Sequence, residues 1–256
     1  MYKIRFRDIL LISNKKKISN NKIILFFYGL GCRSDDFAFL FRNKFLKSQL
    51  FIAELPGHNN LRYNNENIFY YARNIFLFLK KNNIKEIIFF SHSMGGIIPI
   101  ILTKYFLKRS IIIKNFINYE GNLSKYDTET LTKKTISYNK DIFILEKFDK
   151  LVSKSEFSDK IFLNFWSKSL KKTSKEAFYQ LSKECVKLSE TYELLNFFRI
   201  FFKKKVYLNG EYSESKNFNY LHGVKCLKIR DSGHFSFFEN KLEFYRIFNR
   251  LILQKA

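Results

Sequence analysis

A tight turn of small residues between two apolar segments is the feature that most constrains this chain. Residues 87–90 (Ile-Ile-Phe-Phe) have the pattern of a buried strand, residues 91–96 (Ser-His-Ser-Met-Gly-Gly) follow directly, and apolar sequence of helical length resumes at Ile97. A strand that enters a helix through so short a turn brings backbones close together, which requires small side chains on both sides. The segment therefore predicts a sharp strand–turn–helix unit with Ser93 at its apex.

Apolar runs of strand length alternate with amphipathic segments over most of the chain. Helices are expected over residues 68–79, where apolar side chains recur at helical spacing, and over residues 238–253. We expect strands at residues 2–12, 22–28, 51–54, 86–90, 111–118, 206–208 and 225–229. This order predicts an α/β protein with a mostly parallel twisted sheet and helices on both faces.

The alternation stops between residues 123 and 202. This stretch is rich in Lys and Ser and has helical patches without strand-like runs. The chain's 256 residues suffice for one large α/β domain with an insertion. We therefore expect a core built from residues 1–122 and 203–256, interrupted by a helical insertion at 123–202.

The charge balance bears on the partners of the protein. Lys and Arg number 46 against 23 Asp and Glu, a net charge of +23. Such a balance suggests an acidic partner, such as nucleic acid, an anionic membrane face or an acidic carrier protein. Its even spread fits a genome-wide composition bias better, since Asn, Ile and Phe are also abundant. No nucleic-acid-binding motif accompanies the charge, so we expect no nucleic-acid partner.

The cysteines and the apolar runs bear on localisation. Cys32, Cys185 and Cys226 are isolated and show neither metal-ligand spacing nor a disulfide framework, which favours a reducing compartment. Residues 9–12 are too short a run for a signal sequence, and no segment has the ~18 uncharged apolar residues that a membrane span needs. The sequence thus predicts a cytoplasmic protein, with no metal and no cofactor implied.

A serine hydroxyl acts as a nucleophile only when a base lies within hydrogen-bond reach, because it is almost wholly protonated at neutral pH. The chain has four histidines, His58, His92, His222 and His234. His234 is the preferred base, since it follows the last expected strand and precedes the final helix. A loop there can place the imidazole above the end of the sheet. His92 is adjacent to Ser93, but neighbouring side chains on a tight turn point apart.

Four segments, in this order, resemble motifs of the α/β-hydrolase superfamily, and the resemblance covers nearly the whole chain. The segments are Tyr28-Gly29-Leu30-Gly31 for the oxyanion loop, Leu55-Pro56-Gly57-His58 for the turn after the fourth strand, residues 91–96 for the nucleophile elbow, and Gly233-His234 for the histidine loop. In the elbow, Ser91 replaces the first glycine of the G-x-S-x-G pattern. The resemblance implies an α/β-hydrolase fold in which the insertion at 123–202 forms a lid.

The resemblance also implies roles for particular residues. Ser93 would be the nucleophile and His234 its base. The backbone N–H groups of Leu30 and Met94 would form the oxyanion hole, with Gly31 as an alternative to Leu30. The implied activity is that of a serine hydrolase that cleaves a carboxylic ester or thioester through an acyl-enzyme.

The acid of the triad is where the chain departs most from the family. The usual position falls three residues after Gly210, at Ser213, which cannot carry charge. Glu120, after the strand expected at 111–118, matches an alternative acid position known in the superfamily and is the preferred candidate. Glu211 and Glu214 flank the usual site and remain open, as does the absence of any triad acid.

Two smaller departures lie in the oxyanion loop and after the fourth strand. Tyr28 stands where the family usually has histidine, which should affect loop packing more than chemistry. Glu54 stands where aspartate is common.

Two functions of different classes follow from these residues. An aromatic-rich insertion favours an apolar acyl group, and the basic charge suggests an acyl or methyl ester carried by an acidic acyl carrier protein. The alternative, motivated by Ser213, is a catalytically degenerate α/β-hydrolase-fold protein that only binds. The choice between hydrolysis and acyl transfer, the substrate and the oligomeric state stay open.

Overall fold

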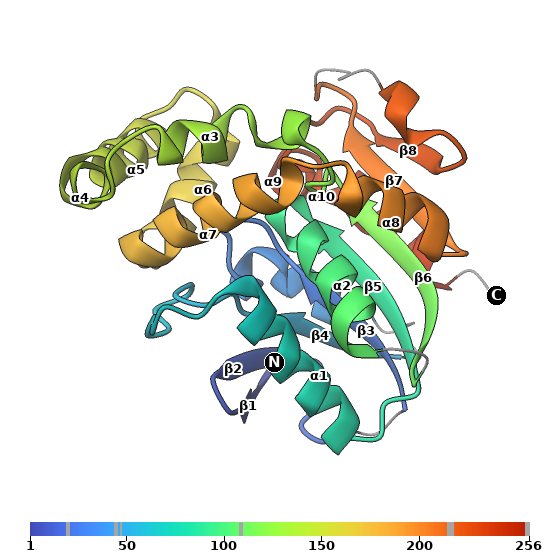
Figure 1. Ribbon diagram of the computed structural model, residues 1–256. Coiled ribbons are helices and arrows are strands. Elements are labelled where there is room, and N and C mark those ends of the chain that lie inside the picture. Colours follow the sequence, from blue (N-terminus) through green and yellow to red (C-terminus); the bar gives the residue numbers. More distant parts are fainter. Residues whose placement is uncertain (19–20, 44–45, 47, 108–109, 214–217, 254–256) are drawn as a thin grey trace.

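In the described part of the chain, eight strands form one twisted sheet in the order β1-β2-β4-β3-β5-β6-β7-β8 (Figure 1). The structure is a computed structural model and describes residues 1–18, 21–43, 46, 48–107, 110–213 and 218–253. The strands are β1 (Tyr2–Phe6), β2 (Ile9–Ser13), β3 (Lys22–Phe27), β4 (Gln49–Ala53), β5 (Glu86–His92), β6 (Ile112–Tyr119), β7 (Lys205–Gly210) and β8 (Lys225–Ile229). All strands from β3 to β8 pair in parallel, whereas β2 pairs antiparallel with β1 and β4. The predicted mostly parallel sheet is confirmed.

The single strand expected over residues 2–12 is wrong, because this segment is a hairpin. β1 and β2 pair antiparallel, and the turn between them holds Arg7 in the left-handed region, with φ 49°. Arg7 and Asp8 are two consecutive polar residues that interrupt the apolar alternation at this point. That interruption is the turn signal that the sequence prediction overlooked.

Helices cover both faces of the sheet (Figure 1). They include the 3₁₀-helix η1 (Ser34–Arg42), α1 (Ile68–Lys81), the 3₁₀-turn η2 (Ser93–Gly96), α2 (Ile97–Leu102), the π-helical turn η3 (Thr103–Leu107), the 3₁₀-turn η6 (Phe218–Leu221), α9 (Ser236–Glu239) and α10 (Lys241–Leu253). The helix expected over 238–253 is two helices, because the backbone of Asn240 leaves the helical region at φ −135°. The Asn240 side chain also accepts a hydrogen bond from the N–H of Glu243 and so caps α10.

Alternate side chains of the central strands pack on opposite faces of the sheet, as the two-residue period of a strand requires. On one face the ring of Phe90 lies 5.8 Å from Phe244 and 5.1 Å from Phe248, both in α10. On the other face Phe27 lies 6.4 Å from Tyr71 of α1. Strands covered on both faces explain why their sequences are almost continuously apolar.

Residues 123–202, between β6 and β7, contain helices and turns and no strand. Most of the helices gather at the carboxyl end of the parallel strands (Figure 1), whereas the last, Glu193–Phe201, packs on the sheet with the ring of Phe198 5.1 Å from that of Phe116 in β6. The helices of this stretch are η4 (Lys125–Thr128, 3₁₀), α3 (Leu131–Ile136), α4 (Lys140–Ile142), η5 (Phe143–Lys147, π-helical), α5 (Phe148–Glu156), α6 (Ile161–Leu170), α7 (Lys175–Ser189) and α8 (Glu193–Phe201). Their division from the core as a separate unit stays a prediction.

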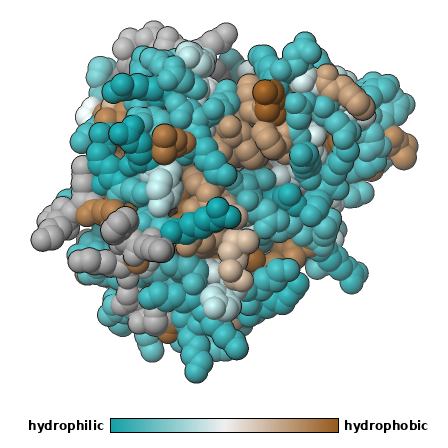
Figure 2. Space-filling model, turned by 180° about the vertical axis from the view of Figure 1, so that it is seen from behind, coloured by the Kyte–Doolittle hydropathy of each residue, from teal (hydrophilic) through white to brown (hydrophobic). Residues whose placement is uncertain are grey.

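Large apolar side chains are concentrated between the sheet and its helices. Phe26, Phe89 and Phe116 are fully buried there. The face shown in Figure 2 is mostly hydrophilic, and its apolar side chains reach the surface in separate areas. Within the described ranges, no helix has the length and apolar character needed to cross a lipid bilayer.

The turn after β5 fits against the neighbouring strand β3 with no room for a side chain. A Cβ placed on Gly95 would lie 2.3 Å from the carbonyl oxygen of Phe27 and 2.6 Å from that of Tyr28. Backbone carbonyls of a central strand cannot rotate away as a flexible side chain can. Glycine at this position therefore allows the turn to dock on β3, as the sequence predicts.

Replacing Gly95 with Ala should lower the free energy of unfolding by about 3 kcal/mol, because the added methyl group would press on the β3 backbone. Urea titration followed by circular dichroism measures this loss. Gly233→Ala is the matched control, since its Cβ would meet nothing closer than Glu239 Oε1 at 3.5 Å. Equal losses in the two variants would contradict this account of the turn.

Candidate active site

Ser93 lies at the apex of the turn from β5 to the following helices. Its backbone is in the left-handed region, with φ 53°, which is costly for a residue with a side chain. A Cβ on Gly29 would come within 2.7 Å of the Ser93 Cβ, so the β3 loop closes tightly against the serine. Ser93 lines a cavity of about 410 Å³ at the carboxyl end of the sheet. The predicted strained elbow is present at this position.

Glu120 and His234 are hydrogen-bonded to each other at the edge of this cavity. The Nδ1 atom of His234 lies 2.6 Å from Glu120 Oε2. The other carboxylate oxygen, Oε1, accepts hydrogen bonds from the backbone N–H of Gly210 at 2.7 Å and from the hydroxyl of Ser213. Burial alone would raise the pKa of Glu120, but the hydrogen bonds from His234, Ser213 and Gly210 outweigh it and lower that pKa.

The three carboxylates that the sequence offered as the acid of the triad differ in what they contact. Glu120 reaches His234 from the end of β6, and Ser213, at the usual acid position, donates a hydrogen bond to it. Glu211 is exposed, and its Oε2 accepts a hydrogen bond from the N–H of Asp231 at 3.0 Å. Glu214 lies outside the described residues.

The loop that carries His234 is held by three side chains from elsewhere in the fold. The hydroxyl of Tyr119 donates to the carbonyl oxygen of Gly233 at 2.8 Å. The carboxylate of Glu239 accepts from the N–H groups of Gly233 at 2.9 Å and Phe235 at 3.0 Å. The imidazole of His92 lies 3.0 Å from the carbonyl oxygen of His234 through Nε2. These contacts fix the backbone on both sides of His234.

His92 is therefore a buried support rather than a base that faces Ser93. Burial, and then the neighbouring charge of His234, lower the pKa of His92 well below its ordinary value. The ring is thus neutral, and its proton lies on Nε2, because the carbonyl oxygen beside that nitrogen can only accept. Its ring stacks on Tyr119 with centroids 4.9 Å apart. The expectation that His92 and Ser93 point apart agrees with this placement.

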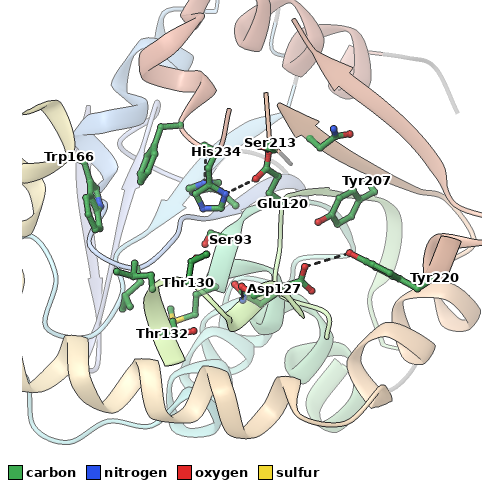
Figure 3. A pocket seen from close by; sticks show the side chains of 17 residues that line it. Ser93, Glu120, Asp127, Thr130, Thr132, Trp166, Tyr207, Ser213, Tyr220 and His234 are labelled. Atoms are coloured by element: carbon green, nitrogen blue, oxygen red, sulfur yellow. Dashed lines mark hydrogen bonds and ion pairs between the residues drawn. The ribbon is translucent and has the colours of Figure 1, made fainter. Parts of the chain in front are cut away.

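Ser93 and His234 line the same cavity (Figure 3). In Figure 3 the serine lies below the imidazole, on the side away from the Glu120 contact. Among the hydrogen bonds of the described residues, those of the His234 ring reach Glu120, and none joins Ser93 Oγ to His234.

In the loop at residues 28–31, which the sequence predicts to form the oxyanion hole, one backbone N–H group already has a hydrogen-bond partner. The N–H of Gly31 donates to Nε2 of His58 at 3.0 Å, and Nδ1 of His58 lies 2.9 Å from the carbonyl oxygen of Pro56. The N–H of Leu30 has no hydrogen-bond partner among the described residues. Met94 lies in the first turn of η2, where N–H groups have no partner within the helix. Leu30 and Met94 both line the cavity, so their N–H groups stay the predicted donors of an oxyanion hole.

The two smaller departures noted in the sequence, Tyr28 and Glu54, are hydrogen-bonded to each other. The hydroxyl of Tyr28 donates to Glu54 Oε2 and accepts from the N–H of Leu55 at 2.9 Å. Asn59 donates to the other oxygen of Glu54 at 2.8 Å, and Ser34 also donates to it. Burial, then the charge of Glu54, raise the pKa of Tyr28 well above its ordinary value. This buried network joins the oxyanion loop to the turn after β4.

The walls of the cavity differ in chemistry. Trp166 of α6 and Phe235 are in contact, with rings 5.5 Å apart, and together with Leu30 they form an apolar wall. Asp127, Tyr207 and Tyr220 also line the cavity. Among the described residues, no three His, Cys, Asp or Glu side chains lie together in a way that could hold a metal ion.

Comparison with solved structures identifies the fold on which this site is built. No protein-family model and no curated protein sequence matches the chain. Solved structures do match. MenH from S. aureus has a TM-score of 0.74 and 17% identity over 95% of this chain and 99% of its own. A carboxylesterase structure from Nitrososphaera gargenis has a TM-score of 0.74 and 15% identity over 97% of each chain.

A third match is a mutant of the N-acyl homoserine lactonase AidH in complex with N-hexanoyl homoserine lactone. Its TM-score is 0.69, with 13% identity over 98% of this chain and 96% of the other. The chain has the α/β-hydrolase fold. In the α/β-hydrolase fold, ligands meet the sheet at the carboxyl ends of its parallel strands, which is where Ser93, Glu120 and His234 lie here.

Lowering the pH should destabilise the protein in part through His58. Burial lowers the pKa of His58 from its ordinary 6.5 to about 4. Below pH 6.5 the unfolded chain therefore binds a proton that the folded chain does not, and stability is lost as the pH falls toward 4. Between pH 6.5 and about 4, His58 lowers the free energy of unfolding by about 3 kcal/mol in total. Above pH 6.5 its contribution to that free energy does not change with pH.

The matched variant is His58→Gln, whose amide oxygen can still accept from the Gly31 N–H. Urea titrations between about pH 7 and 4 should show a smaller loss of stability in this variant than in the wild type. Parallel pH profiles in the two proteins would mean that another group is responsible.

Proposed function

We propose that the protein is a serine hydrolase that cleaves a carboxylic ester or thioester through an acyl-enzyme. The observation that carries the proposal is the hydrogen bond between Glu120 and Nδ1 of His234, at a cavity that Ser93 also lines. A carboxylate bound to Nδ1 fixes the tautomer in which Nε2 is free to take a proton. The site therefore combines a nucleophile on a strained turn with an oriented base.

In the proposed mechanism Ser93 Oγ attacks the carbonyl carbon while Nε2 of His234 takes its proton. The N–H groups of Leu30 and Met94 stabilise the oxyanion, and one such donor contributes roughly 3 kcal/mol. His234 then gives the proton to the leaving group, and water, activated by the same imidazole, releases the acyl group. Glu120 stabilises the imidazolium that forms in both steps.

The proposal requires Ser93 Oγ to approach Nε2 of His234 when substrate binds. Hydrogen bonds between nucleophile and base are commonly long or absent in free enzymes and tighten in the substrate complex. The contacts of Tyr119, Glu239 and His92 with the histidine loop hold the imidazole in place. The movement that the mechanism requires is therefore a rotation of the Ser93 side chain toward the imidazole.

The cavity favours a small substrate with an apolar acyl group. Its volume of about 410 Å³ is within the range of sites for small ligands. The matched Nitrososphaera gargenis structure is a carboxylesterase, and the AidH complex holds a lactone, which is a cyclic ester. Residues 123–202 would act as a lid, since Trp166 of α6 lines the cavity and packs on Phe235 beside His234. Delivery by an acidic acyl carrier protein stays a prediction from the net charge of +23.

Labelling with a fluorophosphonate probe tests the nucleophile. The wild type should react with the probe and hydrolyse p-nitrophenyl butyrate, and Ser93→Ala should lose both activities, because Ser93 is the proposed nucleophile and the nearby Ser213 hydroxyl is hydrogen-bonded to Glu120. Ser137→Ala is the matched control, since this serine is exposed and does not line the cavity. Folded wild-type protein that neither reacts nor hydrolyses esters would favour the binding protein without catalysis.

Removing the carboxylate of Glu120 and introducing one at residue 213 tests the assignment of Glu120 as the acid of the triad. Glu120→Gln should lower kcat by on the order of 10³-fold or more, since the imidazole loses its charged partner. Adding Ser213→Asp to that variant should restore part of the loss, because the Ser213 hydroxyl already contacts the Glu120 carboxylate. Steady-state kinetics with p-nitrophenyl butyrate measure both effects. Glu211→Gln is the control, and a loss there as large as in Glu120→Gln would show that the acid is misassigned.

A further inference from the structure

The first half of α6 is apolar on nearly every side, yet much of it is exposed. Residues 161–165 read Ile-Phe-Leu-Asn-Phe. Ile161 is 69% exposed and Phe165 is 43% exposed, whereas Trp166 and Leu170, in the second half of the helix, are buried. A helix that is apolar on all sides is normally buried. The exposed half of α6 therefore offers an apolar surface to a partner.

The turn that joins α5 to α6 adds a third exposed apolar side chain. Phe157 lies in this turn and is 83% exposed. The turn is fixed by the side-chain amide of Asn164, which donates hydrogen bonds to three of its carbonyl oxygens. These belong to Ser155, Glu156 and Ser158, at 3.2, 2.7 and 2.9 Å. Phe157 is therefore held beside the start of α6, and the α6 surface is defined here as Phe157, Ile161 and Phe165.

The α6 surface is distinct from the side of α6 that meets the active site. On the inner side, the rings of Phe162 and Trp166 lie 5.6 and 5.5 Å from that of Phe235, and Trp166 lines the cavity. The three residues of the α6 surface do not line it. A partner on the α6 surface would thus lie next to the cavity wall without entering the cavity.

Positive charge accompanies these apolar side chains. Residues 154–172 contain five Lys against two acidic residues, and one of the two, Glu156, is paired with Lys171. The ammonium nitrogen of Lys168 lies 5.2 Å from the centre of the Phe165 ring. Lys160 directly precedes α6 and is exposed. The α6 surface therefore combines exposed apolar side chains with an excess of cations, which is complementary to an anionic, apolar partner.

We propose that the α6 surface docks on an anionic lipid surface. Phe157 and Ile161 enter the boundary between headgroups and acyl chains, and the lysines lie against the phosphates. Side chains that stand this far out of a protein can enter a fluid lipid layer directly, whereas a folded acidic protein would have to supply a matching hollow. Because α6 also borders the cavity, docking places the active site beside the lipid.

Co-sedimentation with lipid vesicles tests the docking. The wild type should bind vesicles of equal parts phosphatidylglycerol and phosphatidylcholine, and should bind phosphatidylcholine alone at least tenfold more weakly. Phe157→Ser combined with Ile161→Ser should weaken binding to the anionic vesicles by about tenfold, because less apolar area enters the lipid. Phe201→Ser combined with Ile200→Ser is the matched control, since these two residues are exposed in α8, and it should bind as the wild type does. Circular dichroism checks that each variant is folded.

Insertion is measured separately, because a protein of net charge +23 can adsorb to anionic vesicles through charge alone. The emission of Phe157→Trp should shift to the blue on these vesicles and should be quenched by lipids with brominated acyl chains. Ile200→Trp should show neither effect. Trp166 is the single tryptophan of the wild type and contributes equally to both variants.

Three results would overturn the proposal: no vesicle binding by the folded wild type, undiminished binding by the folded serine variant of Phe157 and Ile161, or no quenching in Phe157→Trp. The serine variant might instead bind vesicles as the wild type does but an acidic acyl carrier protein more weakly. That result would assign the α6 surface to a protein and would also overturn the lipid proposal. Binding is measured without a substrate, so its failure leaves the proposed hydrolase function untouched.

Discussion

The close approach of the turn after β5 to the backbone of β3 is the constraint on which the site depends. Gly95 leaves no room for a Cβ against the carbonyls of Phe27 and Tyr28, and Gly29 leaves none against Ser93. These two contacts lock neighbouring strands together at their carboxyl ends. They also place the oxyanion loop and the serine side by side, so one packing arrangement positions both the proposed nucleophile and the N–H group of Leu30.

One departure from the superfamily pattern is balanced by a residue distant in sequence. Ser213 cannot serve as an acid, but its hydroxyl donates to Glu120, which reaches His234 from a different strand. A carboxylate can approach Nδ1 from either strand because β6 and β7 are adjacent and parallel. The loss of charge at one position therefore does not leave the imidazole without a partner.

Buried histidines outside the proposed triad serve as supports. His58 accepts from the N–H of Gly31, and the Nε2 side of His92 faces the carbonyl oxygen of His234. Burial lowers the pKa of both, so each ring keeps the neutral form in which one nitrogen donates and the other can accept. A protonated ring would lose the acceptor that holds the Gly31 N–H. The loop at residues 28–31 is thus coupled to the protonation state of His58, which is not among the residues that line the cavity.

The amino-acid sequence by itself determined the central parallel strands and the turn at Ser93, because buried strands must be continuously apolar and a tight turn needs glycine. It also brought Glu120 forward as one of three acids. Only the tertiary structure decided that Glu120 contacts His234, that the N–H of Gly31 donates to His58, and that the first expected strand is a hairpin. Each of these depends on contacts between segments far apart along the chain, or on a local turn whose polar signal is only two residues long. Patterns in sequence report burial and backbone freedom, whereas the partner of a polar atom is set by which strands become neighbours.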